Sequence, residues 1–121
     1  MIRRTSYISV MIFHIAEKEI WMKSIKEGWY QVPSLEVEGF IHCSNIDQFI
    51  RVGNFLFKGR QDLVLLEIDE GNLSAPIKYE GETEEKFPHL YGKLNISAVV
   101  RVHPFHPRPN GEFELPVELT R

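Results

Sequence analysis

Residues 38–44 read Glu-Gly-Phe-Ile-His-Cys-Ser, a segment that combines a short apolar strand with one ionisable ring. Aromatic and β-branched residues favour strands, so Phe40 and Ile41 predict a buried strand over 40–43. His42 lies inside this strand among apolar neighbours. An imidazole is a poor choice for filling a strand, which makes His42 a candidate site residue.

The end of this segment predicts a helix. Ser44 and Asp47 resemble a capping box, so we expect Ser44 to be the N-cap of a helix that runs to about Phe57. Side chains alternate along a strand, so Cys43 should face away from His42 and act as a small buried hydrophobe. Ser44 shares the face of His42, and a ligand contact there is the alternative to the cap.

Two further histidines have similar apolar surroundings. His14 follows Ile12 and Phe13, and His89 belongs to the run Phe-Pro-His-Leu-Tyr-Gly at residues 87–92. A buried imidazole without a partner costs about 1–3 kcal/mol, and a single one is usually a structural residue bonded to a carbonyl. Three such residues indicate a shared site, so we expect these histidines and His42 to line one cleft.

Other polar residues receive different interpretations. His103 and His106, flanked by prolines, are expected to face solvent. Glu80 ends a short strand and can face a cleft. The following segment, 81–86, is charged and lacks large apolar side chains, which predicts a mobile, solvated loop.

The remaining pattern predicts an α+β fold with mostly antiparallel small sheets and two N-terminal helices, because strands outnumber helices and both helices come early. We expect a single globular domain over 11–121 and an N-terminal extension over 1–10. We expect strands at 11–15, 77–80 and 96–102 and a central strand at Leu63–Ile68. A helix is expected at 17–27, ending at Gly28, and an extended loop at 29–38. The chain should close with a short edge segment around Phe113 and Leu115.

Composition limits the function. The chain has 121 residues and a net charge of −3 with mixed signs, without the basic stripe that DNA binding usually requires. Its single cysteine excludes an internal disulfide and a cysteine-based zinc cluster. No apolar run approaches the ~20 residues needed to cross a bilayer. We therefore expect a cytoplasmic protein with no membrane or DNA partner.

Residues 13–15, 38–44, 79–80 and 87–92 together carry a resemblance to a known family. Phe-His-Ile, Glu-Gly-Phe-Ile-His-Cys-Ser, Tyr-Glu and Phe-Pro-His-Leu-Tyr-Gly resemble the bacterial "domain of unknown function 952" family over about residues 11–116. The resemblance implies a shared fold and brings no established activity with it.

A more distant resemblance implies a ligand. A histidine on the first strand, a helix with tryptophan, a glycine stop and a second strand ending in His-x-Ser are similar to RNA 2′-phosphotransferases, which have the ADP-ribosyltransferase-like fold. NAD lies between two small sheets in that fold. By this resemblance His14 would contact the nicotinamide ribose, and His42 would line the same cleft. Glu80 or His89 would take the third-motif position.

This resemblance thus implies an NAD- or ADP-ribose-using transferase that acts on a small-molecule nucleotide. The expected catalytic residues are His42, His89 and Glu80, and the expected cofactor-binding residues are His14, Ser44 and Tyr91. One alternative is a non-catalytic nucleotide-binding module. The other is a metal-dependent hydrolase that uses the three histidines, although the sequence lacks a closely spaced ligand pair such as H-E-x-x-H and we expect no metal.

Overall fold

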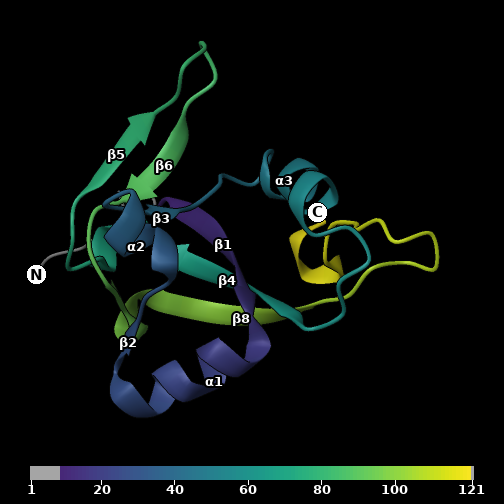
Figure 1. The fold of residues 1–121 in the computed structure, drawn as a ribbon, viewed down its shortest axis with the longest axis horizontal. Coiled ribbons are helices and arrows are strands. Elements are labelled where there is room, and N and C mark those ends of the chain that lie inside the picture. The colour runs from purple at the N-terminus through teal and green to yellow at the C-terminus, as the bar shows by residue number, and fades with distance from the viewer. Residues whose placement is uncertain (1–8, 121) are drawn as a thin grey trace, which may run out of the picture.

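The computed structural model describes residues 9–120 as an α+β fold of small antiparallel sheets (Figure 1). The predicted extension over 1–10 lies almost wholly outside the described residues. The strands are β1 (Met11–Glu17), β2 (Trp29–Tyr30), β3 (Ile41–His42), β4 (Leu63–Asp69), β5 (Ile77–Glu80), β6 (Phe87–Leu90), β7 (Leu94–Asn95) and β8 (Val99–Phe105). The helices are α1 (Lys18–Glu27), α2 (Pro33–Val37) and α3 (Phe49–Leu56), and short 3-10 helices lie at Glu70–Asn72, Ile96–Ala98 and Val117–Leu119.

The central sheet has the strand order β1-β4-β8, with antiparallel pairing throughout. β4 is central because its side chains are apolar on both faces. Val64, Leu66 and Ile68 pack with Trp21 of α1 in one core cluster. Leu63 and Leu65 pack with Phe49 of α3 in a second cluster on the other face. A strand buried on both faces has a nearly continuous apolar run, which confirms the central strand predicted there.

A second sheet, β3-β6-β5, forms the part of the fold that carries His42 and His89. The register pairs these two histidines directly across β3 and β6. The chain leaves β3 and forms an isolated antiparallel bridge between Phe13 and Ser44, with two backbone hydrogen bonds of 2.7 Å. This bridge fixes the end of β3 against β1, which carries His14.

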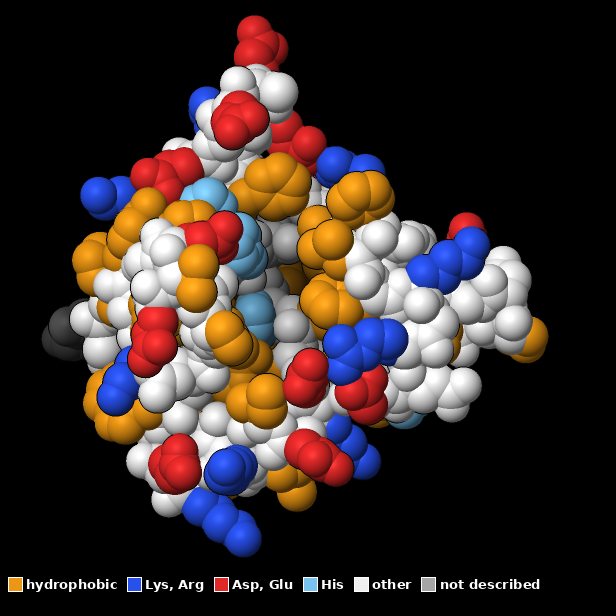
Figure 2. Space-filling view, in the orientation of Figure 1, with side chains coloured by type: hydrophobic (Ala, Val, Ile, Leu, Met, Phe, Trp, Pro, Cys, Tyr) orange, Lys and Arg blue, Asp and Glu red, His pale blue; other side chains and the backbone are white. Residues whose placement is uncertain are grey.

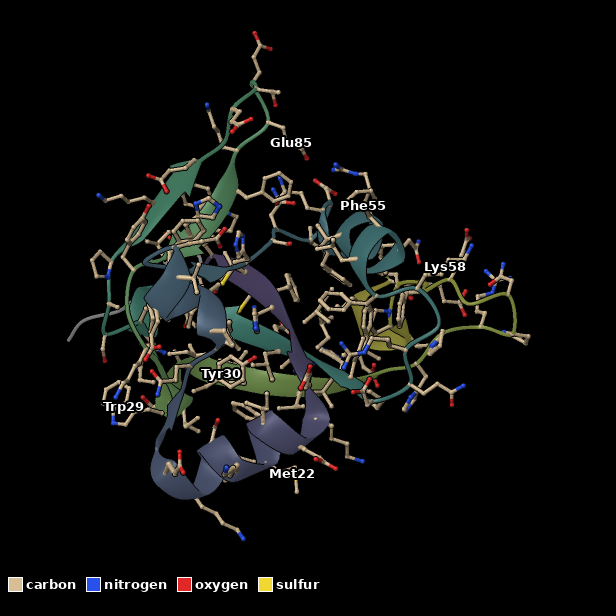
Figure 3. The ribbon with its side chains drawn as sticks, in the orientation of Figure 1. Met22, Trp29, Tyr30, Phe55, Lys58 and Glu85 are labelled. Carbon is tan, nitrogen blue, oxygen red and sulfur yellow. The ribbon has the colours of Figure 1, made fainter. Side chains whose placement is uncertain are left out.

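A two-stranded sheet of β2 and β7 closes the side of the fold next to α1. Alternation along β2 turns Tyr30 inward, where it is 1% exposed, and leaves Trp29 at the surface (Figure 3). Helix α1 ends at Gly28, whose φ of 88° is a left-handed conformation that glycine adopts without strain. The predicted first helix and its glycine stop are therefore confirmed.

Several local predictions are wrong, for identifiable reasons. The expected extended loop at 29–38 contains β2 and α2, because Pro33 stands in the first turn of a short helix, where its fixed φ is favourable. Ser44 is not a helix N-cap: α3 begins at Phe49, and the backbone of Ser44 is committed to the bridge with Phe13. The structure thus has three helices rather than two in its described N-terminal half.

The C-terminal predictions also need correction. The last strand, β8, covers Val99–Phe105 rather than 96–102, because residues 96–98 form a 3-10 helix. His103 is 1% exposed instead of facing solvent, because its ring pairs with Glu67 on β4, with Nε2 2.8 Å from Oε1. Phe113 is buried in the second core cluster but lies in irregular chain, so the expected short edge segment around Phe113 and Leu115 pairs with no strand among the described residues.

Candidate functional site

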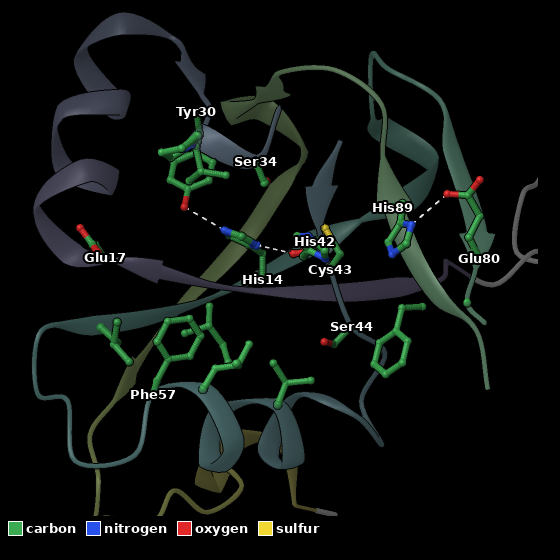
Figure 4. Close-up of a pocket in the computed structure, with 18 of the residues that line it drawn as sticks. His14, Glu17, Tyr30, Ser34, His42, Cys43, Ser44, Phe57, Glu80 and His89 are labelled. Atoms are coloured by element: carbon green, nitrogen blue, oxygen red, sulfur yellow. Dashed lines mark hydrogen bonds and ion pairs between the residues drawn. The ribbon is translucent and has the colours of Figure 1, made fainter. Parts of the chain in front are cut away.

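A cleft of about 660 Å³ lies between the β3-β6-β5 sheet, strand β1 of the central sheet and α3. Figure 2 shows histidine side chains along this hollow, with hydrophobic side chains on its border. His14, His42 and His89 all line the cleft, as the sequence led us to expect (Figure 4). Ser44 and Glu80 also line it, so five of the six predicted site residues meet in one place.

His14 forms the buried back wall of the cleft. Its Nδ1 lies 2.6 Å from the carbonyl oxygen of His42, and its Nε2 lies 2.8 Å from the hydroxyl of Tyr30. A carbonyl can only accept, so Nδ1 carries the proton and Nε2 accepts from the phenol. Burial raises the pKa of Tyr30, which keeps that hydroxyl protonated. Both ring nitrogens of His14 are therefore engaged.

Burial also controls the charge of His14. Desolvation lowers its pKa to about 4, outweighing the hydrogen bond to the carbonyl of His42, which raises it. The ring is consequently neutral at physiological pH. His14 holds β1, β2 and β3 together and has no nitrogen left for a ligand, which argues for a structural role at the site.

His42 and His89 form a pair at the exposed side of the cleft, with ring centroids 5.5 Å apart. Each is bonded to a glutamate: Nε2 of His42 donates to Glu38 over 2.5 Å, and Nδ1 of His89 donates to Glu80 over 2.9 Å. These contacts leave Nδ1 of His42 and Nε2 of His89 without a hydrogen-bond partner among the described residues. Figure 4 shows the ring of His89 directed into the cleft.

Aromatic side chains hold the His89 ring in place. Phe40 stacks on it with a centroid distance of 3.9 Å and an interplanar angle of 12°. Tyr91 donates to Oε1 of Glu80 over 2.5 Å, the oxygen that also accepts from His89. The bonds from Tyr91 and His89 lower the pKa of Glu80, which is therefore an anion at neutral pH. Tyr91 is not among the described residues that line the cleft, so it acts through Glu80.

Ser44 and Cys43 follow His42 on the floor of the cleft. Cys43 is 3% exposed, belongs to the first core cluster, and has a pKa raised to about 12 by burial, so its thiol is not a nucleophile at neutral pH. Ser44 is 6% exposed and lines the cleft. No hydrogen bond to its hydroxyl is found within residues 9–120.

The opposite side of the cleft is apolar. Val52, Leu56 and Phe57 come from α3 and its C-terminal end, and further apolar side chains come from the central sheet and the start of α2. The charged residues of the lining are all acidic: Glu17, Glu80, Glu82 and Glu85. Within residues 9–120 no lysine or arginine lines the cleft.

The tip of the β5–β6 hairpin is attached to α3 across the cleft. Arg51 of α3 forms two hydrogen bonds with the Glu85 carboxylate, of 3.1 and 2.6 Å. Gln48, which is 3% exposed, donates to the backbone oxygen of Lys86 over 2.8 Å. Figure 3 shows Glu85 on the side of the hairpin that faces α3. The segment 81–86, predicted to be a mobile loop, is thus tied to a helix 34–38 residues away.

Sequence reasoning missed several residues of the site. Glu38 and Phe40 belong to the segment 38–44, which also contains His42, and the i, i+2 spacing of Phe40 and His42 on one strand face was a usable signal. The partner of His14, Tyr30, could not be inferred, because the two side chains meet only when β2 is placed against β1. Arg51 was not distinguishable from an ordinary exposed helix residue.

Two features are absent from residues 9–120. No group of three or more histidine, cysteine, aspartate or glutamate side chains there is arranged to hold a metal ion. No helix in that range has the length and apolar character that crossing a membrane requires.

The fold and the cleft define a small α+β protein in which two histidines, each hydrogen-bonded to a glutamate, face a largely apolar pocket. The family model described as "Protein of unknown function (DUF952)" matches residues 15–102, so the chain belongs to this family. The family part of the sequence-based resemblance is therefore confirmed. No curated protein matches the chain.

Solved structures of one relative have the same fold. The crystal structure of protein CC0527 from Caulobacter crescentus superposes with a TM-score of 0.80 at 28% identity and covers 87% of this chain and 94% of its own. The solution NMR structure of CC0527 gives a TM-score of 0.77 at 28% identity, covering 91% and 97% of the two chains.

Proposed function

We propose that this protein is an enzyme that transfers a proton to or from a small molecule in the cleft, with His89 as the general base. The hydrogen bond between Glu80 and His89 is the observation that carries this proposal. It fixes the proton on Nδ1 and leaves the lone pair of Nε2 available to a ligand. A carboxylate in this position also stabilises the imidazolium that forms when Nε2 takes a proton.

His42 supplies a second proton-carrying group. Its ring lies 5.5 Å from that of His89, and Glu38 orients it in the same manner. Two imidazoles that face one ligand can divide the work: a neutral ring removes a proton at its unbonded nitrogen, while a ring already protonated at that nitrogen donates one. His14 is assigned no proton transfer, because both of its nitrogens are bonded and its pKa is lowered to about 4.

The narrower prediction, an NAD- or ADP-ribose-using transferase with an ADP-ribosyltransferase-like fold, stays a proposal. Its support is the meeting of His14, His42, Ser44 and Glu80 in one cleft. The charges of the lining weigh against it, because a pyrophosphate is normally held by arginine, lysine or backbone N–H groups. The acidic lining weighs equally against a non-catalytic nucleotide-binding module, which would also have to hold phosphate groups. A three-histidine metal hydrolase would need a free nitrogen on His14.

The accessibility and basicity of His89 can be tested without a known substrate. Diethyl pyrocarbonate acylates an unprotonated, accessible imidazole nitrogen, and the modified peptides can be followed by mass spectrometry. We expect His89 and His42 to react and His14 to be protected. Glu80→Gln should slow the reaction at His89 and leave the rate at exposed His106, the internal reference, unchanged.

Two results would overturn the proposal. Protection of His89 to the same degree as His14 would show that Nε2 is not available to a ligand. An unchanged rate at His89 in the Glu80→Gln variant would show that the carboxylate does not support the base. A binding screen that includes NAD, ADP-ribose and a 2′-phosphorylated nucleotide tests the narrower prediction separately.

A further inference from the structure

We infer that the cleft is specific for a ligand that carries a protonated amine on an apolar body. This inference names the ligand class of the proposed proton-transfer site, and it rests on that proposal only for the location of the site. Three observations lead to it: the balance of hydrogen-bond donors and acceptors, the pairing of the carboxylates, and the unsatisfied hydroxyl of Ser44.

The polar lining of the cleft is rich in acceptors and poor in donors. His42 and His89 each donate their proton to a glutamate, so their remaining ring nitrogens accept in the neutral form. Tyr30 and Ser34 line the cleft, but their hydroxyl protons are already given to His14 and to the carbonyl of Phe40. Two further hydroxyls of the lining, on Ser44 and Thr83, can accept as well as donate. A lining with this excess of acceptors favours a ligand that donates, which an ammonium group does and an ionised phosphate or carboxylate does not.

The carboxylates of the lining differ in how they are neutralised. Glu17 pairs with Arg60, and Glu85 pairs with Arg51. Glu80 uses Oε1 for His89 and Tyr91, and its Oε2 has no hydrogen-bond partner within residues 9–120.

Glu82 has neither a hydrogen bond nor an ion pair to its side chain in that range. Lys78, on the same strand as Glu80, lowers the pKa of Glu80 but forms no ion pair with it within the described chain. Two carboxylates at the hairpin end of the cleft, Glu80 and Glu82, are therefore left to face a cation.

Ser44 gives an independent indication that a polar ligand group enters the cleft. Its side chain is nine-tenths buried, at 6% exposure, and Figure 4 shows its hydroxyl on the cleft side of the chain. Buried hydroxyls nearly always have a hydrogen-bond partner, and none of the described residues provides one here. Ser44 stands two residues after His42, so the two side chains share one face of the chain and can contact the same ligand.

The rest of the cleft determines the body of the ligand. Val52, Leu56 and Phe57 present an apolar wall opposite the histidines, and the volume of about 660 Å³ suits a molecule larger than a simple alkylamine. Such a ligand would place its apolar part against α3 and its ammonium group beside Glu80 and Glu82. A ring attached to an amine by a short alkyl chain has this shape.

A matched series of three probes tests the charge preference: 2-phenylethylamine, 2-phenylethanol and 3-phenylpropanoate. These share a phenyl ring and a two-carbon arm and differ in whether the end group is cationic, neutral or anionic. Titrations followed by ¹H–¹⁵N NMR at pH 7 should show saturable binding of the amine, with shifts at Ser44 and His89. The alcohol should bind at least tenfold more weakly, and the carboxylate should not bind.

Variants locate the ammonium group. Glu80→Gln and Glu82→Gln should each weaken amine binding about tenfold, the equivalent of about 1.4 kcal/mol, while Glu114→Gln, an exposed carboxylate outside the cleft, should not. Equal binding of the three probes, tighter binding of the carboxylate, or no binding of any probe at millimolar concentration would overturn the inference. Unchanged amine affinity in both cleft variants would overturn it as well.

The two proposals fail in different ways. If the amine binds as described while diethyl pyrocarbonate fails to modify His89, the ligand class stands and the general base is lost. If His89 reacts and depends on Glu80, but the anionic probe binds best, the base stands and the amine preference is wrong.

Discussion

The buried ring of His14 should make the stability of the protein depend on pH in a defined window. The pKa of His14 falls from an ordinary 6.5 to about 4 in the folded protein, so the unfolded chain binds more protons between these values. Stability is therefore fully present above pH 6.5 and decreases as the pH falls toward 4. At about 1.36 kcal/mol per pH unit, the total loss is about 3.4 kcal/mol, of which about 2 kcal/mol is lost at pH 5.

Urea unfolding of the wild type and of His14→Gln at pH 7.5 and pH 5.0 measures this loss. The glutamine variant is expected to be less stable at pH 7.5, but it lacks the titrating ring, so its free energy of unfolding should fall by about 2 kcal/mol less between the two pH values. Glu80 and Glu85, whose pKa values are lowered, are present in both proteins and their contributions cancel.

Equal pH dependence in the two proteins would refute the assignment of His14 as a neutral structural ring. If the variant does not fold, the ¹H chemical shift of the His14 ring in the wild type gives the same information. A midpoint near 6.5 instead of near 4 would then contradict the argument.

Three other substitutions have expected outcomes. His42→Ala should weaken binding of any cleft ligand with little change in melting temperature, because the side chain of His42 is 56% exposed. A large drop in melting temperature with unchanged ligand affinity would instead show that His42 is a packing residue. Arg51→Ala should speed amide hydrogen exchange at 81–86, because it removes the ion pair that holds Glu85. Arg108→Ala, which breaks an exposed ion pair elsewhere, should not, and equal exchange in the two variants would contradict this prediction. His103→Ala should lower the free energy of unfolding in urea by about 3 kcal/mol, because it leaves Glu67 without its buried partner. A loss no larger than that caused by His106→Ala, at an exposed residue, would contradict this prediction.

The parts of the fold that the sequence predicts are those fixed by local pattern. The run Leu63–Ile68, apolar except for Glu67, was the strongest central-strand pattern in the sequence, and the periodicity before Gly28 indicated a helix that ends at this glycine. Ser44 was misinterpreted because its bridge to Phe13 joins segments about thirty residues apart, which local capping rules do not include. His103 was misplaced for a similar reason, because its partner Glu67 is 36 residues away.

The sequence predicted which histidines meet in the candidate site, but not what each of them does there. Apolar surroundings identified His14, His42 and His89, and the cleft brings them together. The sequence could not separate them, because their roles depend on partners supplied by other strands. Pairing of β2 with β7 positions Tyr30 to occupy one nitrogen of His14, and pairing of β5 with β6 positions Glu80 to orient His89.

Burial explains why these three similar rings take different parts in the site. At 8% exposure, His14 is neutral at physiological pH and is hydrogen-bonded at both nitrogens, so it gives the cleft a rigid, uncharged back wall. The side chains of His42 and His89 are 56% and 14% exposed, and each keeps one nitrogen unbonded among the described residues. The bond from His14 to the carbonyl of His42 fixes the strand that carries His42, and the β3–β6 register places His89 opposite it. A ring that stays neutral at physiological pH thus positions the two rings to which we assign proton transfer, and the proposed reaction depends on His14 without passing through it.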